Sequence, residues 1–290
     1  MPTLPGPIVT AAWLGQHATH RPLRIVDLRW SLTPPSGRER YHSGHLPGAI
    51  FLDLDADLSA PRGMGPGRHP IPSGRLLAAV LSARGIGDDH LVVAYDDAGG
   101  SIAARLWWLF RHFGHDGSAA ILDGGLQAWV AAGGPLTLDL PAFAPATWTA
   151  HPARTDDVVD ADFVEGTRHA AHAVLLDVRA GERYRGELEP IDPRAGHIPG
   201  ARSAPWSGDL DDGGLLLPVE QLRQRYQRLG AVTGQPVVAY CGSGVTATHS
   251  ILAMQLAEIP ARLYEGSWSD WSSDPGLPAA TGPDPRGETP

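Results

Sequence analysis

Cys241 is the only cysteine of the chain, and it is the residue with the clearest capacity for covalent chemistry. It opens the segment Cys-Gly-Ser-Gly-Val-Thr-Ala at 241–247, between the apolar run VVAY and a helical pattern. Two glycines let the backbone bend tightly there and bring successive N–H groups close together. Converging N–H groups at the start of a helix form an anion site, so we expect the sulfur to be held as a thiolate nucleophile.

Other residues of the same loop could serve this centre. Gly242 and Gly244 shape the bend, Val245 follows them, and Ser243 and Thr246 offer hydroxyl donors. A lone cysteine is most often a small buried hydrophobe, but a Gly-x-Gly bend after a strand is a poor place for an inert thiol. The loop therefore favours a catalytic cysteine.

Two other classes of protein could carry such a loop. A cysteine phosphatase needs an arginine six positions after its nucleophile to grip phosphate with two bonds, and that position holds Ala247. A non-catalytic binding module could keep the loop without its chemistry. The retained cysteine favours the enzyme, and alkylation of Cys241 separates the two, because only an enzyme must lose its activity.

Length and composition fit an ordinary globular protein of about two domains. The chain has 290 residues, of which 42% are hydrophobic and 19% charged. It has no run of 18 apolar residues, so no membrane association is expected. The N-terminal sequence MPTLPGPIVTAAW lacks a basic region followed by an apolar one, so we expect no secretory signal and a cytoplasmic protein.

Charge and metal-ligand patterns exclude several partner classes. The formal net charge is −9, which disfavours a nucleic-acid surface but still allows a local arginine site for a small anion. One cysteine permits no internal disulfide and is too few for a Cys-rich zinc site or an iron–sulfur cluster. The 13 histidines form no His-Glu-x-x-His motif, so we expect neither a metal nor another cofactor.

The chain contains one long internal repeat. Four segments of the first half recur in the same order in the second: RIVDLR (24–29) and VLLDVR (174–179), GHLPGAI (44–50) and GHIPGAR (196–202), VVAYDD (92–97) and VVAYCG (237–242), LDGGLQAW (122–129) and YEGSWSDW (264–271). A period near half the chain is too long for a solenoid and indicates a duplicated domain. In this alignment Asp96 stands where the second half has Cys241.

The joint between the halves should lie in a proline-rich stretch, Pro135 to Pro152, that lacks a helical period. We predict a first domain at 1–137, a linker at 138–152 and a second domain at 153–290. Each half alternates short apolar runs with amphipathic patterns, which predicts an α/β fold with a mostly parallel sheet flanked by helices. In the second half, the predicted strands are 173–178 and 236–240, and the predicted helices are 219–230 and 245–257.

With these motifs, the chain from about residue 8 to about 275 resembles the tandem rhodanese-domain sulfurtransferases. The shared features are the two GH-x-PG segments, the pairs Asp27/Arg29 and Asp177/Arg179, the run WWLFRHFGH at Trp107–His115, LDGGLQAW and CGSGVTA. The resemblance implies two tandem rhodanese-like domains, with a first copy that serves as a scaffold and a second that carries the active site. It also implies sulfur transfer through a persulfide on Cys241. We interpret the Asp-x-Arg pairs and Trp129 as buried ion pairs and core.

Within that family, this loop is similar to that of the 3-mercaptopyruvate sulfurtransferases. The thiosulfate-type members carry Arg and Lys where this chain has Gly242 and Ser243. The resemblance therefore implies 3-mercaptopyruvate as the small anionic sulfur donor, with thiosulfate as the alternative. It implies cyanide or a thiol such as thioredoxin as the acceptor.

The resemblance also implies roles for residues outside the loop. Arg183 matches the family's substrate-carboxylate arginine, and Arg194 lies near the place of a second one. Asp55, or its neighbour Asp53, matches an aspartate expected to act with Cys241 and Ser243. His69, in GRHPIP, matches a histidine of the same site.

Overall fold

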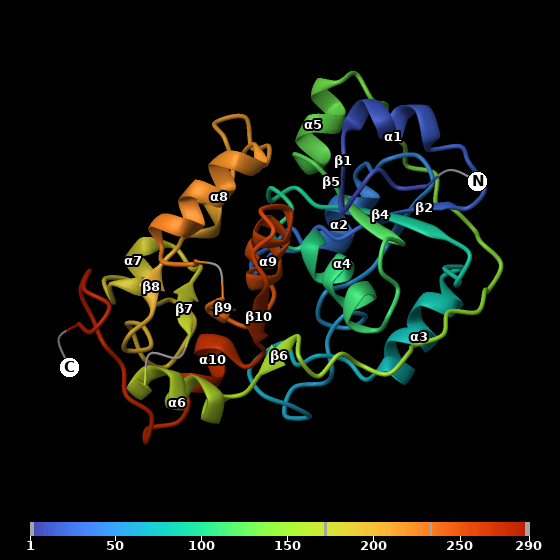
Figure 1. Cartoon of the computed structure of the whole chain (residues 1–290). Helices are drawn as coiled ribbons and strands as arrows, with labels where there is room; N and C mark the ends of the chain where they lie inside the picture. The colour runs from blue at the N-terminus through green and yellow to red at the C-terminus, as the bar shows by residue number, and fades with distance from the viewer. Residues whose placement is uncertain (1–2, 171–172, 233, 288–290) are drawn as a thin grey trace. The chain divides into compact units, whose positions relative to one another are not determined.

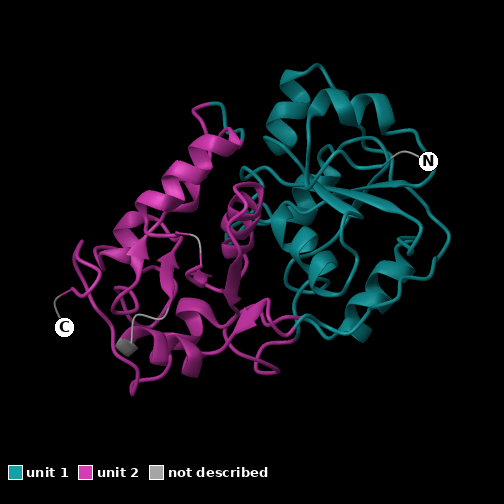
Figure 2. Cartoon of the chain, viewed as in Figure 1, with its two compact units in different colours: residues 1–60, 72–154, 213–215 teal, residues 61–71, 155–212, 216–290 magenta. Residues whose placement is uncertain are grey.

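The computed structural model describes residues 3–170, 173–232 and 234–287, and its strands form two five-stranded sheets (Figure 1). The chain divides into two compact units, which Figure 2 distinguishes by colour. Unit 1 contains 1–60, 72–154 and 213–215, and unit 2 contains 61–71, 155–212 and 216–290. The predicted α/β architecture, with one sheet in each half of the chain, is confirmed.

Unit 1 has strand order β1-β5-β4-β2-β3, and every neighbouring pair is parallel. Its strands are β1 (Ile8–Val9), β2 (Leu23–Asp27), β3 (Ala49–Phe51), β4 (Leu91–Tyr95) and β5 (Ala119–Leu122). Its helices are α1 (Ala11–His17), α2 (Gly37–His42), α3 (Gly74–Ala83), α4 (Ala103–His112) and α5 (Gly125–Ala131). Figure 1 shows α1 and α5 on one side of this sheet and α3 and α4 on the other.

Unit 2 repeats this arrangement with strand order β6-β10-β9-β7-β8, again all parallel. Its strands are β6 (Val158–Val159), β7 (Val174–Asp177), β8 (Arg202–Ser203), β9 (Val237–Tyr240) and β10 (Ala261–Tyr264). Its helices are α6 (Ala161–Ala170), α7 (Gly181–Tyr184), the 3-10 turn η1 (Trp206–Asp209), α8 (Val219–Arg228), α9 (Ala247–Leu256) and α10 (Ser267–Trp271). The repeat found in the sequence therefore corresponds to a repeated topology.

Local sequence accounts for the helix boundaries that matter most. Ser36 and Glu39 form a reciprocal capping box at the start of α2, and the Ser73 hydroxyl caps α3. Leu77 and Leu81, four residues apart, turn the apolar stripe of α3 inward, where both are fully buried. The all-apolar strands β4 and β9 are covered on both faces, as parallel sheets require.

Both Asp-x-Arg pairs are buried ion pairs, as predicted. In each, the arginine Nη2 lies 2.6 Å from the aspartate Oδ2: Arg29 with Asp27, and Arg179 with Asp177. Arg179 also donates to the carbonyl oxygen of Gly196, which opens the segment GHIPG. The pair thus ties the end of β7 to the following loop. Trp129, 6% exposed, lies in the core of unit 1, which confirms its structural role.

The two segments that connect the halves are not symmetrical. Residues 138–152 contain no helix or strand and lie along unit 1, where Trp148 is buried and Ala146 N–H donates to the carbonyl of Ser82. The segment 61–71, by contrast, belongs to unit 2 although it lies in the first half of the sequence. Among the described residues, no helix is both long and apolar enough to cross a membrane.

Candidate active site

Cys241 lies directly after β9, at the carboxyl end of a central strand, where ligands of parallel sheets bind. Backbone hydrogen bonds fix it to α10. Its N–H donates to the Ser267 hydroxyl at 3.1 Å, and its carbonyl accepts from Trp268 N–H at 3.0 Å. The next carbonyl, of Gly242, accepts from Ser269 N–H at 2.8 Å. The loop is therefore held rigidly on one side, while Cys241 is 3% exposed.

The second glycine of the loop is required by both conformation and space. Gly244 has φ of +77°, which favours glycine, and a Cβ there would lie 2.5 Å from the carbonyl oxygen of Glu265. Val245 is buried, and its carbonyl accepts from the backbone and hydroxyl of Thr248. Thr246 precedes α9, but its side chain does not cap the helix. Its proposed role toward the sulfur therefore does not compete with capping.

The structure brings together two of the predicted site residues. Ser243 Oγ is hydrogen-bonded to His69 Nδ1 at 2.7 Å, and both side chains are buried, with exposed fractions of 7% and 4%. A histidine and a hydroxyl at this distance can pass a proton between them. Ser243 is two residues from Cys241 in the sequence, so this pair is a candidate for proton transfer near the sulfur.

The segment 61–71 is attached to the supports of the catalytic loop. Arg68 N–H donates to the Ser269 hydroxyl at 3.1 Å, and Ile71 N–H donates to Glu265 Oε1 at 2.7 Å. Both acceptors belong to the β10–α10 region that holds Cys241 and Gly242. His69 is therefore fixed from both sides of its own position in the chain.

Arg183 is not a solvated surface charge. Its Nη2 donates to Glu189 Oε1 at 2.7 Å and to Asp192 Oδ2 at 3.1 Å, and its Nε donates to Glu189 Oε2 at 3.2 Å. Both acids are nearly fully buried. Burial raises the pKa of Asp192, and its two arginine neighbours, Arg68 and Arg183, act against that rise.

Arg68 is a candidate site residue that the sequence did not indicate. It forms an ion pair with Asp192, the same carboxylate that Arg183 contacts. A Cβ on Gly242 would lie 3.1 Å from Arg68 Nη2 and 3.5 Å from Arg183 Nη1. Arg68 lies far from the loop in sequence and in a segment without a regular pattern, so no spacing signal could have found it.

Arg194 has a different environment from the one expected of a donor-binding residue. Its three guanidinium nitrogens donate to the backbone carbonyls of Trp271, Ser272, Asp274 and Leu277 at 2.7–2.8 Å. These bonds hold the turn after α10. We therefore do not include Arg194 among the proposed donor-binding groups.

The two candidate aspartates belong to unit 1. Asp53 accepts from the N–H groups of Asp55 and Ala56, so its side chain shapes the local turn. Asp55 is exposed, and its Oδ2 accepts from Trp30 Nε1 at 2.7 Å. The catalytic role of Asp55 stays a prediction.

The loop of unit 1 that corresponds to the cysteine loop is built around an anion. The buried Asp96 carboxylate accepts N–H bonds from Ala98, Gly100, Ile102 and Ala103, all at 2.8–2.9 Å. Burial raises the pKa of Asp96, and these four bonds oppose the rise. Each oxygen acts twice as an acceptor, which suits the ionised form. This loop position in the fold can therefore gather N–H groups around one negative charge.

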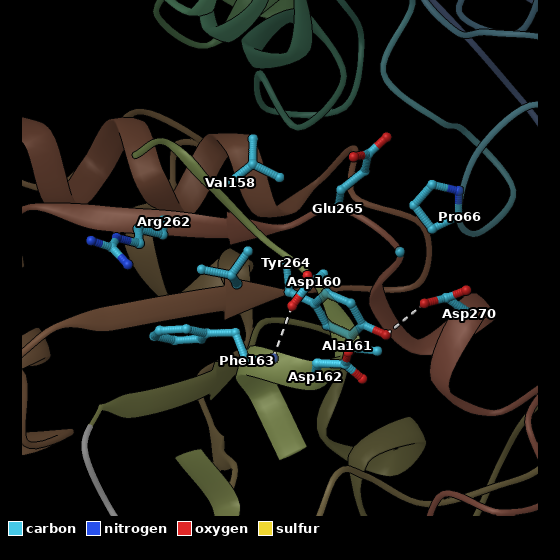
Figure 3. Close-up of a pocket in the computed structure, with 12 residues that line it drawn as sticks. Pro66, Val158, Asp160, Ala161, Asp162, Phe163, Arg262, Tyr264, Glu265 and Asp270 are labelled. Atoms are coloured by element: carbon cyan, nitrogen blue, oxygen red, sulfur yellow. Dashed lines mark hydrogen bonds between the residues drawn. The ribbon is translucent and has the colours of Figure 1, made fainter. Parts of the chain in front are cut away.

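A cavity of about 590 Å³ lies beside β6 and β10 in unit 2 (Figure 3). Tyr264 Oη donates to Asp270 there, and Asp160 accepts from Phe163 N–H at the start of α6. Cys241 is not among its described lining residues, so we do not assign the sulfur chemistry to it. Nor does the described part of the chain contain three or more His, Cys, Asp or Glu side chains grouped to hold a metal ion.

Comparisons with known proteins agree with the topology. The model of the Rhodanese-like domain matches residues 10–132 and 160–274. A Pseudomonas aeruginosa protein named a probable 3-mercaptopyruvate sulfurtransferase is 46% identical over 281 residues, covering 95% of this chain and 98% of the relative. The Mycobacterium tuberculosis protein SseB, provisionally named a thiosulfate sulfurtransferase, is 40% identical over 279 residues, covering 95% and 97%. The crystal structure of the 3-mercaptopyruvate sulfurtransferase SseA from Escherichia coli superposes with a TM-score of 0.80 at 30% identity, covering 91% of this chain and 99% of that one.

Proposed function

The chain belongs to the rhodanese family, and we propose that it moves sulfur from 3-mercaptopyruvate to an acceptor through a persulfide on Cys241. The observation that carries this proposal is the position of Cys241. The cysteine is the first residue of the loop at the carboxyl end of β9 in unit 2. The corresponding loop of unit 1 has the Asp96 carboxylate at the same position, surrounded by backbone N–H groups. By analogy with that loop, we propose that the sulfur of Cys241, or its persulfide, lies where unit 1 has the Asp96 carboxylate.

The proposed first step is attack of the Cys241 thiolate on the donor sulfur. The donor C–S bond breaks, its electron pair leaves with the carbon as pyruvate enolate, and the new S–S bond leaves Cys241 as a hydropersulfide. The enolate then takes up a proton to give pyruvate. In the second step, the acceptor takes the outer sulfur and restores the thiolate, as in other two-step covalent mechanisms.

We propose that Ser243 and His69 handle the proton in the first step. Their 2.7 Å contact permits proton transfer, and both are shielded from bulk water. Asp55 is proposed to act with them. Cyanide or a thiol such as thioredoxin is the proposed acceptor, and the cytoplasm, which maintains reduced thiols, is the proposed compartment.

Thiosulfate is the second candidate donor, on two observations. One relative carries its name, and two guanidinium groups lie near Gly242 although the loop itself has no cation. These cations stand outside the loop. This position suits 3-mercaptopyruvate, whose carboxylate lies away from its sulfur, better than thiosulfate, which is a compact dianion.

We expect a higher kcat/KM with 3-mercaptopyruvate than with thiosulfate. The check is a comparison of initial rates with cyanide as the acceptor, measured as thiocyanate formed. Pyruvate release should match thiocyanate one for one. A higher kcat/KM with thiosulfate would replace the proposed donor by the second candidate and leave the cysteine mechanism in place.

Replacing Arg183 by glutamine should raise KM for 3-mercaptopyruvate by roughly 10- to 150-fold, because one charge-assisted bond is worth about 1.5–3 kcal/mol. Arg185→Gln is the matched control. Arg185 lies two residues away, pairs with Glu187 at the surface, and should leave KM unchanged. Equal effects of both changes would show that general charge, rather than the position of Arg183, attracts the donor.

A further inference from the structure

Two guanidinium groups from distant parts of the sequence converge on Gly242, next to the nucleophile. Nη2 of Arg68 and Nη1 of Arg183 lie 3.1 and 3.5 Å from the position that a Cβ on Gly242 would take. Each distance is short enough that a methyl group would touch the guanidinium. Because Gly242 has no side chain, both guanidinium groups can lie directly against the catalytic loop at this residue.

The nitrogens that face Gly242 are not the ones held by the carboxylates of Asp192 and Glu189. The Asp192 carboxylate accepts hydrogen bonds from Nη1 of Arg68 and Nη2 of Arg183. The Glu189 carboxylate accepts from Nε and Nη2 of Arg183. Within the described residues, neither Arg68 Nη2 nor Arg183 Nη1 donates a hydrogen bond to the protein. The buried acids thus orient both guanidinium planes and leave one edge of each directed at Gly242.

The backbone of Arg68 is fixed as firmly as its side chain. Its N–H is bonded to Ser269, whose own N–H is bonded to the carbonyl of Gly242. The following residue, His69, is bonded to Ser243. Arg68 is therefore held beside the loop by its own bond to Ser269 and by the bond of its neighbour His69 to Ser243, which is the preorganisation expected of a binding group.

We propose that Arg68 and Arg183 form a two-arginine clamp for the carboxylate of the sulfur donor, with Arg68 as a specificity-determining residue. The inference rests on the proposed function and deepens it, since it names the groups that select the donor. Two guanidinium edges can hold the two oxygens of one carboxylate, one each. The 3-carbon length of the donor would then leave its thiol sulfur free to reach the neighbouring cysteine.

Arg68→Gln in the full chain tests the clamp. We expect KM for 3-mercaptopyruvate to rise about 10- to 100-fold, with a smaller change in kcat. Arg62→Gln is the control, because Arg62 is exposed on the same segment and should leave KM unchanged. A second donor, 1-mercaptopropan-2-one, keeps the thiol and the ketone but lacks the carboxylate. Its kcat/KM should be the same in the unchanged protein and in Arg68→Gln.

Gly242→Ala provides an independent variant that leaves both arginines in place. Gly242 does not have a left-handed backbone, so alanine is conformationally permitted, but its methyl group would lie against Arg68 Nη2 and Arg183 Nη1, the edges proposed to bind the donor. We expect KM for 3-mercaptopyruvate to rise again, with an unchanged melting temperature. This variant keeps the test decisive if Arg68→Gln does not fold.

The outcomes separate the clamp from the proposed function. Mass spectrometry of the unchanged protein after treatment with 3-mercaptopyruvate should show one added sulfur on Cys241. If that sulfur is absent, the proposed donor and the clamp both fail. If it forms, and KM stays within twofold in Arg68→Gln and Gly242→Ala, the clamp alone is overturned. An equal loss with the carboxylate-free donor would also overturn it, because it would assign Arg68 a purely structural role.

Discussion

Cys241→Ser is expected to remove sulfur transfer, with kcat/KM lowered by at least about 10⁴-fold for any donor. A serine hydroxyl has no accessible anion at neutral pH and forms no persulfide, so both half-reactions are lost. The fold should persist. The bonds that hold this residue, to Ser267 and from Trp268, use its backbone groups and are unchanged by the substitution.

Three measurements check this expectation. Initial rates of thiocyanate formation report turnover, mass spectrometry reports the sulfur bound to the protein, and a thermal melt reports the fold, with a melting temperature expected within a few degrees. Because Cys241 is the only cysteine, thiol alkylation of the unchanged protein should reproduce the loss. Transfer above background in the serine variant would eliminate the persulfide mechanism. Full activity after complete alkylation would instead favour the binding module.

The parts of the fold that the sequence predicted are those governed by local pattern. The apolar runs at 91–95 and 236–240 became β4 and β9, because a parallel strand covered on both faces needs a continuous apolar run. The repeated Asp-x-Arg motif gave the same buried ion pair twice. Within the candidate site, the residues of 241–247 were identified because they are contiguous and their types are unusual together.

The parts that could not be predicted depend on contacts between distant segments. Nothing in the spacing of Arg68 indicates that its guanidinium shares Asp192 with Arg183. Arg194 shows the opposite difficulty. Its position in the chain predicts a place near the donor, yet its guanidinium donates to the backbone carbonyls that follow α10. An arginine's length lets it reach several neighbours, so sequence position alone does not tell which one it serves.

Asp96→Ala is expected to have the second large effect, on stability rather than on chemistry. The substitution removes the acceptor of four backbone N–H groups in a buried loop. Hydrogen bonds to charged groups are worth about 1.5–3 kcal/mol each, but the four share one carboxylate and water can partly replace it. We therefore expect a loss of about 3–5 kcal/mol in the free energy of unfolding of unit 1, comparable to breaking a buried ion pair.

Urea titration of the full chain, with the two units followed as separate transitions where they resolve, measures this loss. Asp97→Asn is the matched control. Asp97 is the next residue, and its partly exposed pair with Arg40 should contribute less than about 1 kcal/mol. At temperatures where Asp96→Ala remains folded, its kcat/KM should equal that of the unchanged protein, because the Asp96 loop is proposed to be structural and to take no part in the chemistry.

The stability and the activity of Asp96→Ala together decide what the Asp96 loop of unit 1 does. A loop that gathers N–H groups needs an anion at its centre, whether or not it performs chemistry. In unit 2 we propose that a thiolate or persulfide meets this need, and in unit 1 the Asp96 carboxylate does so permanently. If Asp96→Ala left stability within about 1 kcal/mol of the unchanged value, the loop would not need its anion. If instead activity fell while stability was retained, the Asp96 loop would take part in catalysis and its purely structural role would be wrong.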